Sequence, residues 1–286
     1  MTVTLPFMQV DVFTDRPFLG NPVAVILDAD GLDTGTMQRI ARWTNLSETT
    51  FVLPPTAPEA SYRLRIFTPM SELPFAGHPT LGSAHAVVSA GLAPRGPLLQ
   101  ECGVGLVPVQ VEPADRYRLR LPEARVTTLG AAERTALEAA LGAATDPTVP
   151  LQVIDVGPRW LVTALAEPSV LLALQPDLTR LAAFERATRT IGVTLFAERG
   201  ADGHDIEVRT FAPSDGVPED PVCGSGNGAV AVMRRALGRV SPGGSYLAQQ
   251  GRCVGRDGRI EIALDAAGDI WVGGACVTTV SGVLQD

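Results

Sequence analysis

Hydrophobic and polar residues alternate along several short segments of the chain, and glycine or proline closes most of these segments. Alternation over residues 7–14 and 62–68 predicts half-buried β-strands, because successive side chains of a strand point to opposite faces. The short apolar run at residues 23–27 predicts a buried strand. Apolar residues at helical spacing predict an amphipathic helix over residues 34–43. This mixture of elements indicates an α+β protein.

Two glycine-rich turns lead into apolar helices that are rich in alanine and valine. We expect one helix to begin at Gly77 and to end near Gly91, and the other to begin at Gly224 and to end near Gly238. The free N–H groups and the positive dipole end of a helix start favour a bound anion. We therefore expect both helix starts to face one cleft and to hold one carboxylate there.

The second half of the chain repeats the order of elements of the first half. A predicted helix at residues 178–190 corresponds to the one at 34–43, and a predicted strand at 206–213 matches residues 64–69 in pattern. Corresponding elements, including the two glycine-rich helix starts, are separated by roughly 145 residues. An ordered series at one offset indicates an internal duplication.

The duplication predicts two pseudo-symmetric lobes, each a curled mixed sheet around a central helix. The two glycine-led helices are apolar over most of their surface, which suits burial inside such a sheet. The segment at residues 143–150 is the best linker candidate, so we place the lobes at 1–145 and 146–286. The short strands predicted near the C-terminus are candidates to pack back on the first lobe.

Composition and charge exclude several classes of function. The net charge is −8, and nucleic acid and anionic membranes both require basic patches, so neither is an expected partner. No apolar run reaches the length of a membrane span, and the N-terminus lacks the features of a signal peptide, so we expect a cytoplasmic protein. The sequence has neither a phosphate-binding loop, nor a dinucleotide-binding motif, nor metal-ligand spacing, so we expect no cofactor and no metal.

Three longer motifs resemble those of one known family. They are Asn45-Leu-Ser-Glu-Thr-Thr-Phe-Val, Glu72-Leu-Pro-Phe-Ala-Gly-His-Pro-Thr-Leu-Gly and Glu219-Asp-Pro-Val-Cys-Gly-Ser-Gly. In this order they are similar to the PhzF family of phenazine-biosynthesis-like isomerases, and the similarity extends from about residue 10 to residue 231. The resemblance implies the two-lobed fold of diaminopimelate epimerase, which agrees with the duplication, and it implies a homodimer.

The resemblance also implies roles for six residues. Glu48 is the expected acid/base that moves a proton between substrate carbons, since a carboxyl group in an apolar cleft can take and return a proton. His78 and Asp220 are expected to flank the ligand and to position it or to relay protons. Gly77, Gly224 and Ser225 are expected to bind the substrate carboxylate. Each of these residues also has a purely structural interpretation, as a loop residue, a helix cap or a packed side chain.

Cys223 leaves an alternative open. The family most often has threonine there, and Cys-Gly-Ser-Gly also resembles a motif of epimerases that use two cysteines. A thiol at a helix start is expected to have a lowered pKa and could act as a base. The mirrored position is Ala76, so a two-thiol mechanism lacks its second thiol, and we favour Cys223 as a buried small residue.

The sequence therefore predicts a cofactor-free isomerase of a small carboxylate. Two alternatives remain: an amino-acid epimerase or racemase that uses Cys223, and a binding protein that has lost catalysis. Arg63 and Arg65 alternate with apolar residues, and we expect them on a solvated face of a strand.

Overall fold

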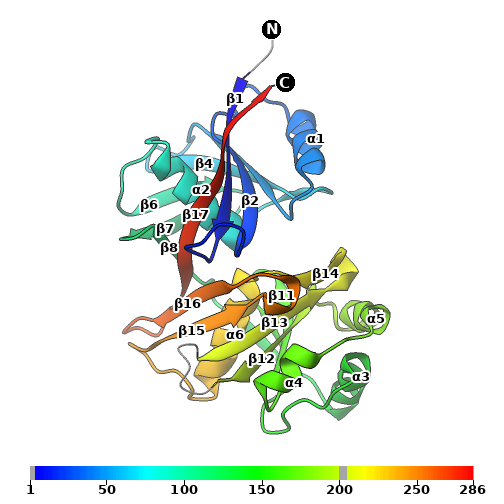
Figure 1. Cartoon of the computed structure of the whole chain (residues 1–286). Coiled ribbons are helices and arrows are strands. Elements are labelled where there is room, and N and C mark those ends of the chain that lie inside the picture. Colours follow the sequence, from blue (N-terminus) through cyan, green and yellow to red (C-terminus); the bar gives the residue numbers. More distant parts are fainter. Residues whose placement is uncertain (1–3, 200–204, 286) are drawn as a thin grey trace. The chain divides into compact units, whose positions relative to one another are not determined.

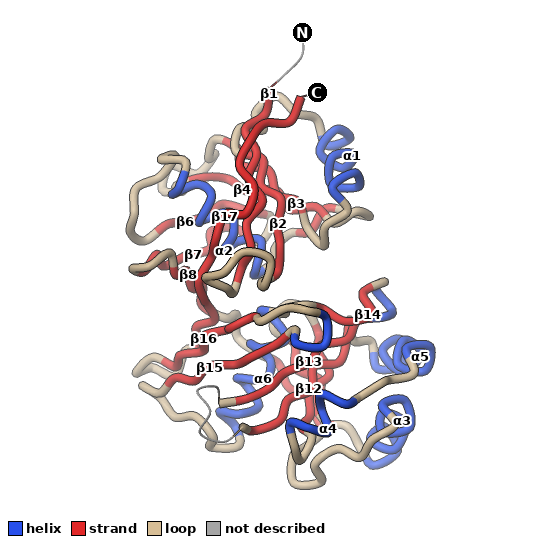
Figure 2. Tube along the Cα trace, in the orientation of Figure 1, coloured by secondary structure: helices blue, strands red, loops and turns tan. Residues whose placement is uncertain are grey.

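The structure is a computed structural model that describes residues 4–199 and 205–285. Its chain divides into two compact units, which are described separately. Unit 1 comprises residues 1–120 and 273–286, and unit 2 comprises residues 121–272. Figures 1 and 2 show each unit as a curved sheet with helices.

Unit 1 consists of a sheet and two helices. Its elements are β1 (Thr4–Val12), β2 (Asn21–Ile26), α1 (Thr34–Thr44), β3 (Thr49–Leu53), β4 (Tyr62–Phe67), β5 (Glu72–Leu73), α2 (Gly77–Ser89), β6 (Leu98–Cys102), β7 (Gly105–Glu112), β8 (Arg116–Arg120) and the C-terminal part of β17 (Ile270–Gln285). Eight of the strands close into a barrel in the order β17, β1, β2, β3, β4, β6, β7 and β8, and β8 pairs with β17 again. In Figure 1 the red strand β17 runs beside the blue strand β1.

Helix α2 packs against strands β1, β2, β3, β4 and β8 of this barrel. Eleven of its thirteen residues are buried, which explains why its sequence has almost no polar face. The strands come so close that a Cβ atom built on Gly82 would lie 2.4 Å from Cγ1 of Val23 and 2.9 Å from Cγ2 of Val12. Glycine is therefore required at this position of the helix by packing.

We expect Gly82→Ala to lower the free energy of unfolding by about 1–3 kcal/mol, the usual cost of overpacking a core. Gly77→Ala in the same helix is the matched control, since a Cβ atom there would have no neighbour within 4 Å. The control variant should be as stable as the wild type or slightly more stable, because alanine favours helix. Urea unfolding of both variants measures the difference, and equal stabilities would contradict the close packing.

Unit 2 repeats this arrangement and adds two helices. Its elements are β9 (Arg125–Thr128), α3 (Ala131–Leu141), β10 (Gln152–Asp155), β11 (Arg159–Ala164), α4 (Pro168–Ala173), α5 (Leu178–Thr188), β12 (Gly192–Glu198), β13 (Ile206–Ala212), η1 (Pro213–Asp215), β14 (Val217–Asp220), α6 (Gly224–Ala236), β15 (Ser245–Gln250), η2 (Arg252–Val254), β16 (Gly258–Leu264) and the beginning of β17. Helices α3 and α5 pack against each other (Figure 1). Helix α6 is the counterpart of α2 and buries ten residues.

The two units have matching strand directions, which confirms the predicted duplication. Strands β2 and β3 are parallel, as are β11 and β12. Strands β4 and β6 are parallel, as are β13 and β15. The next pairs along the chain, β6 with β7 and β15 with β16, are antiparallel in both units.

The division of the chain differs from the expected boundary at residue 145. Leu137 and Leu141 of α3 belong to the buried core of unit 2, so the segment that follows them is a loop within this unit. The side chains of Arg134 and Glu138 hold this loop at Thr145 through hydrogen bonds. The C-terminal tail belongs to unit 1, where it pairs with β1 over residues 276–285. None of the helices in the described part of the chain has the length and hydropathy to span a membrane.

Candidate active site

The six residues singled out in the sequence fall into two groups, one in each unit. Glu48, Gly77 and His78 lie in unit 1, and Asp220, Gly224 and Ser225 lie in unit 2. Both groups are built around the first turn of the central helix of their unit. The expectation that both groups serve one ligand stays a prediction.

The first turn of α2 offers two N–H groups. Ala76 is the N-cap in an extended conformation, and the N–H of Thr80 is the first that donates within the helix, to the carbonyl of Ala76. Pro79 has no N–H. Within the described residues, the N–H groups of Gly77 and His78 have no acceptor, which is the usual state of a helix start that can receive an anion.

Glu48 and His78 are in contact. Glu48 immediately precedes β3, and its Oε2 lies 3.4 Å from Nε2 of His78. Both side chains are largely buried, with 15% and 10% of their surface exposed. The chain thus brings together a carboxyl group and an imidazole that are 30 residues apart in sequence.

The proton of the neutral His78 ring can be assigned to Nδ1. Burial lowers the pKa of His78 to about 3, and a hydrogen bond to the carbonyl of Pro22 opposes this only in part. A carbonyl only accepts, and Nε2 makes no hydrogen bond within the described chain, so Nδ1–H is the group that donates to Pro22. Nε2 therefore presents its lone pair to Glu48. When Glu48 is protonated, this contact becomes an O–H···N hydrogen bond.

In unit 2 a short turn at residues 221–223 connects Asp220, the last residue of β14, to the start of α6. One carboxylate oxygen of Asp220 accepts the N–H of Val222 at 3.0 Å. Burial is the main cause that raises the pKa of Asp220 to about 6; the thiol of Cys223 and the N–H of Val222 lower it, and the charge of Glu219 raises it. A carboxyl group with this pKa exchanges its proton close to neutral pH.

The first turn of α6 mirrors that of α2. Cys223 is the N-cap, as Ala76 is in α2, and its Sγ accepts the N–H of Gly226 at 3.3 Å. The N–H groups of Gly224 and Ser225 have no acceptor in the part of the chain that the structure describes. The Ser225 hydroxyl accepts the indole N–H of Trp160 at 3.0 Å, which fixes its oxygen.

The expectation of a lowered pKa for Cys223 is wrong. Burial is the largest cause and raises the pKa of this thiol well above its ordinary value, and the nearby charge of Asp220 raises it further. The N–H of Gly226 and the Ser225 hydroxyl lower the pKa but do not outweigh burial. The thiol therefore stays protonated near neutral pH, so a helix start alone does not make it a base.

Three further residues hold this turn and were not recognised in the sequence as part of it. Gln250 is fully buried at the end of β15; its Oε1 accepts the N–H of Cys223, and its Nε2 donates to the carbonyl of Asp220. Asn227 donates to the carbonyl of Cys223 and to Gln250. The third residue is Trp160, whose indole N–H donates to the Ser225 hydroxyl. A glutamine and a tryptophan in buried strands look like ordinary core residues in a sequence, so only the fold identifies their partners.

Comparisons with known proteins identify the family. A family model described as "Phenazine biosynthesis-like protein" (PhzC-PhzF) matches residues 10–282. A Schizosaccharomyces pombe protein named "Antisense-enhancing sequence 1" is 41% identical over 96% of this chain and 97% of its own. A trans-2,3-dihydro-3-hydroxyanthranilate isomerase from Pseudomonas aeruginosa is 37% identical over 92% of this chain and 91% of its own.

The solved structures agree with the fold. A PhzF-family protein from Bacillus anthracis matches with a TM-score of 0.88 over 99% of both chains at 24% identity. A hydroxyproline epimerase from Agrobacterium vitis shares the fold with a TM-score of 0.66 at 17% identity, over 99% of this chain and 92% of its own. The predicted epimerase-like fold of two similar lobes, each with a central helix, is therefore confirmed. By the family match over nearly its whole length, the chain belongs to the phenazine biosynthesis-like (PhzC-PhzF) family, whose relatives include named isomerases.

Proposed function

We propose that the protein is a cofactor-independent isomerase of a small carboxylate, in which Glu48 moves a proton between two substrate carbons. The observation that carries this proposal is the contact between Glu48 and the neutral imidazole of His78. Beside it lie two N–H groups that have no acceptor among residues 4–199 and 205–285. The isomerase name of the Pseudomonas relative supports the reaction class.

The proposed reaction needs no external electron donor or acceptor. The Glu48 carboxylate takes a proton from a carbon next to a C=C bond, and the electron pair of the broken C–H bond shifts that double bond. The protonated Glu48 returns the proton to the other end of the system. Meanwhile the lone pair of His78 Nε2 accepts a hydrogen bond from the new O–H, which stabilises the protonated carboxyl group until its proton is exchanged with solvent or returned.

The helix starts would serve as the binding groups. N–H pairs at Gly77 and His78 and at Gly224 and Ser225 suit a carboxylate, whose charge strengthens hydrogen bonds from a helix start. Asp220 would act as the second proton-exchanging group, since its pKa of about 6 allows both states near neutral pH. We therefore propose a small unsaturated carboxylic acid as the substrate.

Deuterium exchange tests the proposal. The probe is trans-2,3-dihydro-3-hydroxyanthranilate, the compound named for the relative, together with other small unsaturated acids, each incubated with the protein in D₂O. Binding is detected in parallel samples in H₂O, from shifts of the backbone amide signals of Gly77 and Gly224. An acid that binds should gain deuterium at carbon. An acid that shifts these signals but never exchanges a carbon-bound proton would instead support a binding protein without catalysis.

The alternative epimerase mechanism makes an opposite prediction for Cys223. We expect Cys223→Ser to keep the deuterium-exchange rate within about tenfold of the wild type, because the thiol is protonated and serine also caps a helix well. The control is the exposed Cys253→Ser. A loss of more than about a hundredfold in Cys223→Ser only, with Glu48→Gln still active, would assign proton abstraction to the thiol.

A further inference from the structure

A buried ion pair lies next to Asp220 in unit 2. The guanidinium of Arg209 in β13 binds the carboxylate of Glu219 in β14 through two hydrogen bonds of 3.0 and 2.7 Å. The two side chains are only 6% and 11% exposed. Such a two-pronged pair fixes direction as well as distance, which one lysine could not do.

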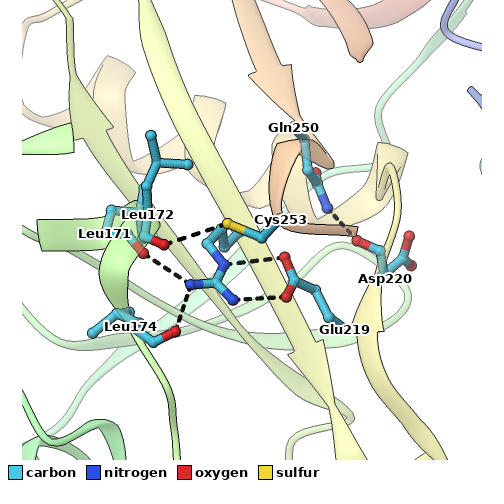
Figure 3. A network of polar contacts seen from close by, with 8 residues as sticks. Leu171, Leu172, Leu174, Glu219, Asp220, Gln250 and Cys253 are labelled. Carbon is cyan, nitrogen blue, oxygen red and sulfur yellow. Dashed lines mark hydrogen bonds and ion pairs between the residues drawn. The ribbon is translucent and has the colours of Figure 1, made fainter. Parts of the chain in front are cut away.

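Arg209 also connects this ion pair to the end of α4 and to Phe211. Its Nη1 donates to the carbonyls of Leu171 and Leu174 at the end of α4, and its guanidinium stacks over Phe211 at 4.8 Å. Figure 3 shows these carbonyls on one side of the guanidinium group and Glu219 on the other. The guanidinium of Arg209 therefore donates hydrogen bonds both to carbonyls at the C-terminus of a helix and to a carboxylate.

The segment that this pair holds is the one that presents Asp220. Glu219 and Asp220 are consecutive in β14, and Asp220 pairs with Thr210, the residue that follows Arg209. From the other side Gln250 donates to the Asp220 carbonyl at 2.9 Å (Figure 3). Residues 219–220 are thus held by the Arg209–Glu219 ion pair and by the hydrogen bond from the Gln250 side chain to the Asp220 carbonyl.

Unit 1 contains a matching pair with a different neighbour. Arg65 in β4 binds Glu72 in β5 through two hydrogen bonds of 2.7 Å and lies over Phe67 at 5.1 Å. This pair is more exposed, at 21% and 39%. The residue after Glu72 is Leu73, which has no charge. The duplicated chain therefore keeps the pair in both units but places a titratable group beside it only in unit 2.

We propose that Arg209 and Glu219 are positioning residues that hold Asp220 in place and keep a carboxylate charge beside it. This inference rests on the proposed role of Asp220 in proton exchange. Glu219 is paired with Arg209 in a buried place, and its charge raises the pKa of its neighbour Asp220. The pair thereby supports a carboxyl group that can both donate and accept a proton near neutral pH.

Other charged or titratable groups lie around residues 219–220, and the test has to take them into account. Those on the elements packed around it are Glu207 and Arg209 on β13, Asp215 in η1, Glu219 on β14, Cys223 at the start of α6, and Arg252, Cys253 and Arg256 in and after η2. Cys253 donates to the carbonyl of Leu172 beside the pair. The variants below leave all the other members of this set unchanged.

The test is a titration of the Asp220 carboxyl group by NMR of the ¹³C-labelled full chain, with no substrate added. The Asp220 signal is assigned by its loss in Asp220→Asn. We expect a pKa of about 6 in the wild type. In Glu219→Gln the pKa should fall by roughly 0.5 to 1, because the repulsion is lost and Arg209 is left unbalanced.

Two further variants separate charge from folding. Arg209→Gln/Glu219→Gln removes both charges and leaves two amides that can bond each other, so the pair is replaced without a buried lone charge. Its Asp220 pKa should lie between those of the wild type and Glu219→Gln. Glu72→Gln, the matched change in unit 1, should leave the Asp220 pKa unchanged.

The inference is overturned if the Asp220 pKa stays within about 0.2 of the wild type in both unit 2 variants. It is also overturned if Glu72→Gln moves this pKa as far as Glu219→Gln does. Because no turnover is measured, these results are independent of deuterium exchange. An inactive protein with the expected pKa series would refute the proposed isomerase and leave the positioning pair in place.

Discussion

Glu48→Gln is expected to lower the rate of deuterium exchange by roughly 10²–10⁴-fold, the usual contribution of a general acid/base. Glutamine has the shape of glutamate but cannot take a proton. The variant should keep its fold, because the amide still fits beside Nε2 of His78 and can donate a hydrogen bond to that lone pair.

The matched control for this change is Glu59→Gln, an exposed glutamate in the same unit. Its exchange rate should equal that of the wild type within a factor of two or so, as is common for surface changes. If Glu48→Gln keeps more than about a tenth of the wild-type rate, Glu48 is not the proton-transfer group, and the proposed function fails with it.

Asp220→Asn is expected to reduce exchange by a similar roughly 10²-fold while making the protein more stable at alkaline pH. Folding raises the pKa of Asp220 from 3.8 to about 6. Below about pH 3 the carboxyl group is protonated in both the folded and the unfolded state. Between pH 3.8 and pH 6 the unfolded state releases this proton while the folded state keeps it, so the native aspartate progressively lowers the free energy of unfolding, and the loss is complete above pH 6.

The expected gain in the asparagine variant is on the order of 1–3 kcal/mol at pH 8, and it should vanish below about pH 3. The asparagine Oδ1 can still accept the N–H of Val222, so the turn is preserved. Urea unfolding at about pH 3 and at about pH 8 measures this difference. A gain that does not depend on pH would show that packing, and not the carboxylate charge, is responsible.

The sequence predicted the duplication and the two helix starts because both depend on local patterns. Glycine at the start of α2 and α6 and the nearly unbroken apolar surface of these helices are visible in consecutive residues. The contact between Glu48 and His78 depends on how β3 lies beside α2, and here the family resemblance, not the pattern, indicated the residues. Glu48 and His78 could be named as candidates from the resemblance, but the burial that lowers the pKa of His78 could not be predicted.

The features that the sequence did not reveal are long-range ones. Arg65 lies on the partly exposed face of β4, in line with its alternation with apolar residues, but the sequence did not reveal that it binds Glu72 from a neighbouring strand. The pKa of Cys223 was expected to fall because of the helix start, whereas burial, which no local pattern reports, raises it. The boundary between the units was placed at a proline-rich loop, but the packing of α3 assigns this loop to unit 2.

The last strand gives the chain a particular order of assembly during synthesis. Strand β17 pairs with both β1 and β8 and so closes the barrel of unit 1. Its residues 273–285 leave the ribosome after all of unit 2. Until then the nascent first unit has two open sheet edges, which invite pairing with other chains. The second unit, by contrast, is a continuous segment of the chain and can fold while the first is still waiting for its final strand.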